Sequence, residues 1–144
     1  MRIVIDLQGA QSSSRFRGIG RYSISLATAI VRNRGNHEVH LVLNGLFRET
    51  IKPIRKAFEG ILPQKNIHIW YAPGPTKECN AGNEQLRESA ELIREAFIAN
   101  LKPDLLHISS IFEGFSDDAV TTIGRINTQY PISVSFYDLS LIHI

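Results

Sequence analysis

The sequence predicts an α/β fold built on a doubly wound parallel sheet. Five short runs of apolar and β-branched residues alternate with segments whose apolar residues recur at helical spacing. No two-residue hairpin signal joins neighbouring runs, which favours parallel strands connected by helices over an antiparallel meander. With 144 residues the chain is long enough for one ordinary domain and too short for two substantial ones.

The first half of the chain predicts two strands and two helices. Residues 2–7, "RIVIDL", are typical of a strand buried on both faces, and the polar segment 8–17 follows it. The next helix ends at the stop signal Gly35 and carries an apolar stripe formed by Ile19, Tyr22, Leu26, Ala27 and Ile30. Residues 37–43 predict the second strand. Residues 47–59 predict a helix in which Pro53 lies in the first turn or causes a kink.

The second half predicts three strands and two helices. Strands are expected at 66–71, 104–109 and 131–138, and a Pro/Gly-rich loop at 72–83. Residues 84–101 predict an amphipathic helix, and residues 116–130 a further helix with Ser116 as its N-cap. In the helix 84–101 we expect an apolar face of Leu86, Ala90, Ile93, Phe97 and Leu101, and a solvated face of Glu84, Arg87, Glu88, Glu91, Arg94 and Glu95.

Composition excludes several classes of function. Sixteen Lys and Arg against fourteen Asp and Glu leave a net charge of +2, so a nucleic-acid-binding surface is not indicated. The single cysteine, Cys79, rules out an internal disulfide framework, and the spacing of the histidines predicts no metal site. The apolar stretch at the start is too short for a signal peptide, and no stretch reaches membrane-spanning length. We expect a cytoplasmic protein, with peripheral association at the inner face of the membrane as an open alternative.

Positive charge gathers in the segment "SRFRGIGRYS", residues 14–23. Arg15, Arg17 and Arg21 lie at a predicted helix start, where the helix dipole already favours anions over cations. Gly18 and Gly20 leave the backbone bare, so amides there can approach a phosphate or carboxylate closely. The segment does not match the dinucleotide fingerprint, because about ten residues separate it from the strand and the third glycine is absent. The alternative is that the glycines form a loop-to-helix joint and the arginines are solvated.

Three segments resemble one known family. "DLQGAQ" followed by "RGIGRYS", then "HISSIFEGF", then "VSFYDL" resemble bacterial glycosyltransferases of the retaining family 4 (group 1) type, in the same order along the chain. The resemblance implies a Rossmann-like sheet and the amino-terminal half of a GT-B enzyme. Residues 1–144 would then be a truncated acceptor-side domain that lacks the donor-binding domain, so the chain alone is expected not to turn over.

The resemblance also implies roles for particular residues. Gly18, Gly20 and Arg21 would contact the diphosphate of the donor. Catalytic residues are not assigned, no metal is needed, and the co-substrates would be a nucleotide sugar and a glycan or glycolipid acceptor, with surface polysaccharide as the commonest product. The residues expected to bind the acceptor are Arg15, Arg17, Glu113, Tyr137 and Asp138.

Other interpretations of the same residues stay open. Glu113 is equally well a solvated loop carboxylate, Tyr137 a packing residue and Asp138 the cap of a turn. Asp6 is expected to anchor the neighbouring loop rather than to take part in chemistry. We also expect Gly20→Val to reduce turnover while leaving the fold nearly intact. The alternative function is a non-catalytic flavodoxin-like module that binds an anionic ligand or a protein.

Of three further residues with ring side chains, we expect two to have structural roles and one to be able to contact a sugar. His107 is expected to be a hydrogen-bonded core histidine and Trp70 a core residue, whereas Tyr71 can offer an aromatic face to a sugar.

Overall fold

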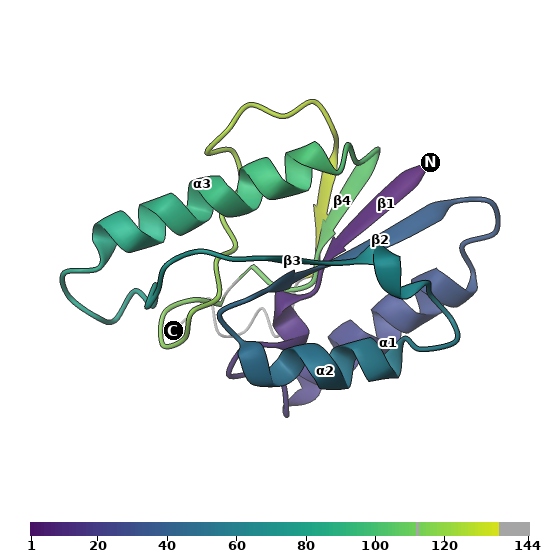
Figure 1. Cartoon of the computed structure of the whole chain (residues 1–144), viewed down its shortest axis with the longest axis horizontal. Helices are drawn as coiled ribbons and strands as arrows, with labels where there is room; N and C mark the ends of the chain where they lie inside the picture. Colours follow the sequence, from purple (N-terminus) through teal and green to yellow (C-terminus); the bar gives the residue numbers. More distant parts are fainter. Residues whose placement is uncertain (112, 136–144) are drawn as a thin grey trace.

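The predicted parallel sheet is confirmed. A computed structural model describes residues 1–111 and 113–135, and its five strands are all paired in parallel in the order β3-β2-β1-β4-β5 (Figure 1). The central strand β1 therefore separates β2 and β3 from β4 and β5. The strands are β1 (Arg2–Asp6), β2 (Glu38–Asn44), β3 (Ile67–Trp70), β4 (Leu105–Ile108) and β5 (Ile132–Val134).

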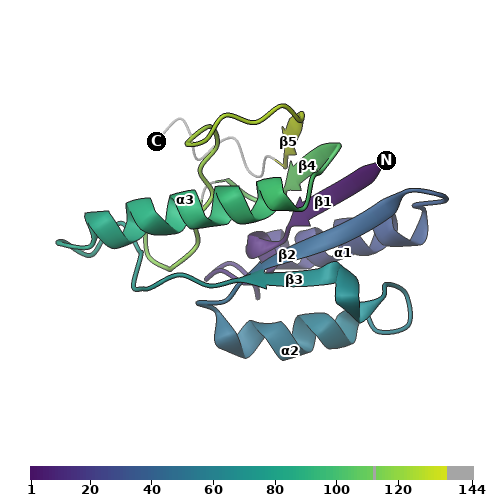
Figure 2. The ribbon, with the colours of Figure 1, turned by 45° about the horizontal axis from the view of Figure 1, so that its top comes forward.

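Helices cover both faces of the sheet, as the doubly wound prediction requires. The helices α1 (Gly18–Arg32) and α2 (Arg48–Ala57) lie on one face, and α3 (Glu84–Asn100) lies on the other (Figures 1 and 2). Two single-turn 3-10 helices, η1 (Gln8–Ala10) and η2 (Gln64–Asn66), precede α1 and β3.

Alternate residues of the strands supply two separate cores. Ile5 and Leu41 pack with α1 and α2, whereas Val4 and Val42 pack with α3 and the buried Trp70. Both cores are needed because a central parallel strand is apolar on both of its faces. Because all the strands are parallel, their carboxyl ends lie together along one side of the sheet, which we call its carboxyl edge.

The prediction of a helix at 116–130 is wrong. The described residues between Glu113 and β5 contain no helix. Their backbone groups bond instead to buried side chains: Gln8 bonds both the N–H and the carbonyl of Val120, and Glu95 accepts from the N–H groups of Arg125 and Ile126. These long-range partners replace the hydrogen bonds that a helix would have made within the segment.

The solvated face predicted for α3 is also partly wrong. Arg94 and Glu95 are 1% and 6% exposed, whereas Ile93, expected on the apolar face, is 37% exposed. Arg94 is paired with Asp6, and Glu95 accepts a 2.7 Å bond from the Thr122 hydroxyl, so both charges are compensated. The helix therefore bonds to β1 through Arg94 and to residues 122–126 through Glu95.

Pro53 lies deeper in α2 than the sequence predicts. It is the sixth residue of the ten-residue helix rather than part of the first turn. Because proline lacks an N–H, α2 forgoes one hydrogen bond, the one that would reach the carbonyl of Glu49.

Candidate functional site

The candidate site lies where the strand order reverses, between the carboxyl ends of β1 and β4. In open parallel sheets ligands bind at such a switch point, because the connections leave the two strands toward opposite faces. The hydroxyl of Ser109, directly after β4, accepts a 2.9 Å hydrogen bond from the N–H of Gly9 in η1, the short helix that follows β1. A β-carbon on Gly9 would lie 2.6 Å from Ser23 Oγ, so only glycine lets η1, α1 and β4 approach so closely.

A buried polar network fixes the segment that leaves β1. Arg94 Nε donates to Asp6 Oδ2 at 2.8 Å, and the Gln8 side chain donates to both Asp6 oxygens at 3.1 and 3.2 Å. Gln8 Oε1 accepts from Asn44 Nδ2 at 2.9 Å and from the N–H of Val120 at 2.8 Å. The anchoring role predicted for Asp6 is confirmed.

Gln11 extends this network to the neighbouring strand and helix. Its amide donates to the carbonyl of Asn44 and to the Thr50 hydroxyl, both at 3.0 Å, and its oxygen accepts from the Asn44 N–H at 2.8 Å. The two glutamines of "QGAQ" thus tie β1, β2 and α2 together at the carboxyl edge. Sequence reasoning missed their role, although two polar residues directly after a buried strand were the available signal.

The glycines at the start of α1 occupy different environments. A β-carbon on Gly18 would meet nothing within 4 Å, and in the part of the chain that the structure describes the N–H groups of Gly18 and Ile19 have no acceptor. A β-carbon on Gly20 would lie 2.5 Å from the backbone carbon of Arg15, and the Gly20 N–H already donates to Ser14. The expectation that valine at Gly20 spares the fold is therefore wrong.

The three arginines gather around this helix start. Arg17 is the N-cap residue of α1, and its side chain makes no capping bond. Arg21 donates to the Phe16 carbonyl at 3.3 Å, and the Arg15 guanidinium lies 4.7 Å from the centre of the Phe16 ring. The loop and helix start at residues 15–21 thus bring together Arg15, Arg17, Gly18, Gly20 and Arg21. The contacts of these residues with donor or acceptor stay predictions.

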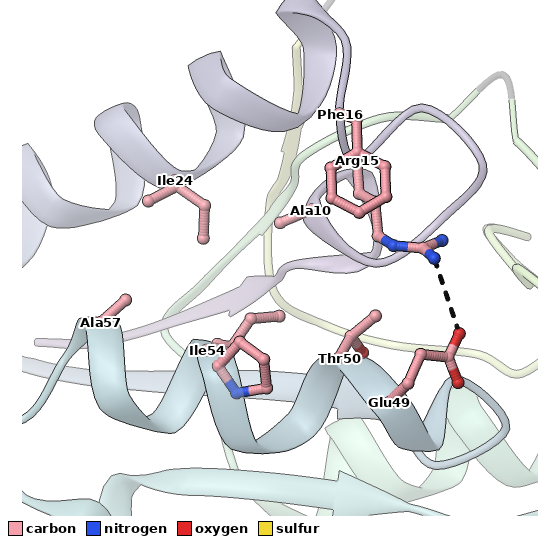
Figure 3. A pocket seen from close by; sticks show the side chains of 9 residues that line it. Ala10, Arg15, Phe16, Ile24, Glu49, Thr50, Ile54 and Ala57 are labelled. Carbon is pink, nitrogen blue, oxygen red and sulfur yellow. Dashed lines mark ion pairs between the residues drawn. The ribbon is translucent and has the colours of Figure 1, made fainter.

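A largely apolar pocket of about 310 Å³ opens between α1 and α2, beside this turn. Figure 3 shows Ile24 of α1 facing Ile54 and Ala57 of α2, with Phe16 and Arg15 at one end. There Arg15 Nη2 lies 3.9 Å from Glu49 Oε1, a loose ion pair between partly exposed side chains. The pocket places Arg15 at the boundary between apolar wall and solvent.

Glu113 lies on the other side of the switch point, in the connection after β4. Its carboxylate is half-buried and accepts a 3.2 Å hydrogen bond from the Ser110 hydroxyl. Burial raises the pKa of Glu113 above its usual value, and the charge of Asp117 adds to the rise, while the hydroxyls of Ser110, Ser12 and Ser14 oppose it. The group is thus a carboxylate among hydroxyls, a setting that suits hydrogen bonding to further hydroxyl groups.

We expect Glu113→Gln to change the pH dependence of stability. Because the folded-state pKa is raised, the protonated carboxyl stabilises the fold at low pH, and that contribution is lost as the pH rises through the folded value. Glutamine has no such proton to lose. Thermal unfolding should show equal stabilities near about pH 4 and a more stable variant near about pH 8. A difference that is constant with pH would contradict the raised pKa.

Tyr137 and Asp138 lie outside the described residues. Trp70 is a core residue, as predicted, whereas the prediction of a core position for His107 is wrong, because His107 is hydrogen-bonded but only half-buried. His107 forms hydrogen bonds with the Ser133 and Ser135 hydroxyls at 2.7 and 3.0 Å, and Trp70 is 1% exposed.

Within residues 1–111 and 113–135, no three His, Cys, Asp or Glu side chains are arranged to hold a metal. No helix in those ranges is long and apolar enough to cross a bilayer.

The sheet order and the helices on both faces define a Rossmann-like domain, and the candidate site lies at its switch point. Comparison with known proteins adds a chemical class: the chain is homologous to a glycosyltransferase. It is 34% identical over 140 residues to an Escherichia coli protein named serotype-specific mannosyltransferase WbdA. The aligned region covers 96% of this chain and 17% of that protein.

Two further Escherichia coli proteins of the same name match shorter stretches. One is 32% identical over 99 residues, covering 68% of this chain, and the other is 29% identical over 115 residues, covering 79%. The chain spans 17%, 12% and 14% of the lengths of the three relatives. No family model and no solved structure matches the chain.

Proposed function

We propose that these residues form the acceptor-side Rossmann-like domain of a GT-B glycosyltransferase. The reaction would move a mannosyl group from a nucleotide sugar to a glycan or glycolipid acceptor. One observation carries the proposal: a protein named as a mannosyltransferase is 34% identical to this chain over 140 residues, which cover 96% of the chain. The word "serotype-specific" in that name supports a surface polysaccharide as the product.

The geometry at the start of α1 supports a role toward the donor. We propose that the N–H groups of Gly18 and Ile19, which have no acceptor among the described residues, face the diphosphate across a cleft, assisted by Arg21. Fixed amides and cations of this kind stabilise the charge that develops on a departing diphosphate. Gly20 would contribute indirectly, because its packing on Arg15 sets the path of this turn. The other wall of the cleft would be a second, donor-binding domain.

The acceptor would lie along the same edge. Arg15 and Arg17 offer positive charge for an anionic acceptor, and Glu113 offers a carboxylate for sugar hydroxyls. Tyr137 and Asp138 stay proposed acceptor residues. A phosphate-bearing glycolipid would also bring the domain to the inner face of the membrane.

Chemical-shift mapping tests the acceptor side of this proposal. The isotopically labelled chain is titrated with α-linked mannobiose, and with cellobiose as the matched control. We expect shifts in the amides of residues 8–20 and 109–115, which flank the switch point, and smaller effects with cellobiose. Residues 34–37 and 60–64, which precede β2 and β3 at the opposite edge, should not respond. Shifts confined to that opposite edge would contradict the proposal, as would no shift with either sugar.

A further inference from the structure

The strongly exposed aromatic side chains gather near one edge of the sheet. Among the described residues they are Phe16, Tyr22, Tyr71 and Phe115, which are 77%, 52%, 68% and 68% exposed. Phe16 lies between β1 and α1, Tyr71 directly follows β3, and Phe115 lies in the connection after β4. These three rings therefore lie in connections that follow the carboxyl ends of strands, where parallel sheets bind their ligands.

The Tyr71 ring packs against the backbone of Gly45 and is otherwise exposed. A β-carbon on Gly45 would lie 2.6 Å from Tyr71 Cε1, so the ring rests directly against the bare backbone of Gly45. The Gly45 N–H donates to the Trp70 carbonyl at 2.8 Å, which continues the pairing of β2 with β3 past the ends of both strands. One part of the ring is therefore backed by fixed backbone while the rest faces solvent. A ring that is already positioned loses little entropy on binding.

The chain beyond Tyr71 is joined to the segment that carries Glu113 and Phe115. The N–H groups of Glu78 and Cys79 donate to the carbonyls of Gly114 and Phe115 at 3.0 and 2.8 Å. Thr76 reinforces this junction, since its N–H donates to the Asp118 carboxylate at 2.9 Å. The backbone that follows Tyr71 is therefore bonded to the segment that carries Glu113 and Phe115.

We propose that Tyr71, Glu113 and Phe115 bind a glycan chain of several sugar units, with Tyr71 as the stacking platform for a sugar ring. The proposal rests on the glycosyltransferase function proposed above and names its acceptor as an oligosaccharide rather than a single sugar. A pyranose has apolar C–H faces and a rim of hydroxyls, so it needs aromatic rings and hydrogen-bonding groups side by side.

An extended surface predicts that affinity rises with the length of the ligand. Glu113, beside the switch point, would hold one sugar unit, and Tyr71, at the end of β3, would hold another farther along. Mannobiose would reach one of these positions and mannotetraose both. Removing the Tyr71 ring should therefore abolish the gain from length while leaving the binding of mannobiose nearly unchanged.

Calorimetric titration of the 144-residue chain tests this. We expect mannotetraose to bind about tenfold more tightly than mannobiose, and Tyr71→Ala to remove that difference, since one stacked ring is worth about this factor. Tyr71→Phe should keep the difference, and Phe115→Ala should reduce it. Leu92→Ala, which removes an exposed apolar side chain from α3, is the matched control. Unfolding temperatures of all variants confirm that the fold is kept.

The other possible results of these titrations would overturn the role proposed for Tyr71, the proposed function, or both. Equal affinity of the wild-type chain for the two sugars, or a length preference that survives Tyr71→Ala, would overturn the platform and leave the proposed function standing. Tyr71-dependent binding to phosphatidylglycerol vesicles in place of sugar would also overturn it. Absence of any sugar binding, together with no chemical-shift change at the switch point, would overturn both proposals.

Discussion

Arg94→Met is expected to destabilise the domain by about 3–5 kcal/mol, because it leaves the Asp6 carboxylate buried without its cation. Asp6 is fully buried, and Arg94, which is 1% exposed, contacts it through two nitrogens of the guanidinium. Asp6 would keep only the bonds from Gln8, whose position holds the segment after β1. Urea denaturation followed by circular dichroism measures the free energy of unfolding.

The matched control is an arginine in an ion pair that is less buried. Arg125 Nη2 lies 3.0 Å from Glu91, and the side chains of Arg125 and Glu91 are 43% and 13% exposed, so Arg125→Met should cost less than Arg94→Met. Adding Asp6→Asn to Arg94→Met removes the orphaned charge and should recover part of the loss. A loss below about 1 kcal/mol for Arg94→Met alone would show that the buried pair does not hold the edge.

Local patterns predicted most of the fold. The β-branched runs around Ile5, Val42 and Ile69 have to be buried on both faces, and only a parallel sheet covered by helices buries them so. The start of α1 at Gly18 was predictable from the apolar stripe that follows. These features depend on neighbours in sequence, which is why one sequence suffices to predict them.

Features that depend on distant partners could not be predicted. The periodicity of residues 116–130 favours a helix, but it carries no sign that Gln8 takes both backbone groups of Val120. Arg94 and Glu95 look like any charged helix face until Asp6 and Thr122 are placed against them. At the site, Gly18 and Gly20 of one motif differ because only Gly20 lies against Arg15.

Gly18→Glu is expected to reduce sugar transfer by on the order of a hundredfold, the effect of losing one preorganised donor. The position is open, so the side chain fits without displacing other atoms. A carboxylate in the first turn of a helix favours the fold by a few tenths of a kcal/mol. The same charge would stand where we propose the diphosphate binds and would repel it. Stability and transfer should therefore change in opposite directions.

Gly18→Ala is the control for bulk without charge, whereas Gly20 is unsuitable for this test. Alanine at Gly18 meets no neighbouring atom, so it should alter transfer far less than glutamate does. A side chain at Gly20 would push against the backbone of Arg15, and a loss of activity there would report distortion of the turn.

The most direct test of glycosyl transfer at this edge is the rate of mannosyl transfer from a nucleotide sugar. It is measured in the polypeptide that carries these residues, for wild type, Gly18→Ala and Gly18→Glu, beside their unfolding temperatures. We predict transfer by wild type, a modest decrease for Gly18→Ala, and an approximately hundredfold loss for Gly18→Glu at an unchanged or higher unfolding temperature. Transfer by Gly18→Glu at the wild-type rate, or no transfer by wild type from any nucleotide sugar, would contradict the account.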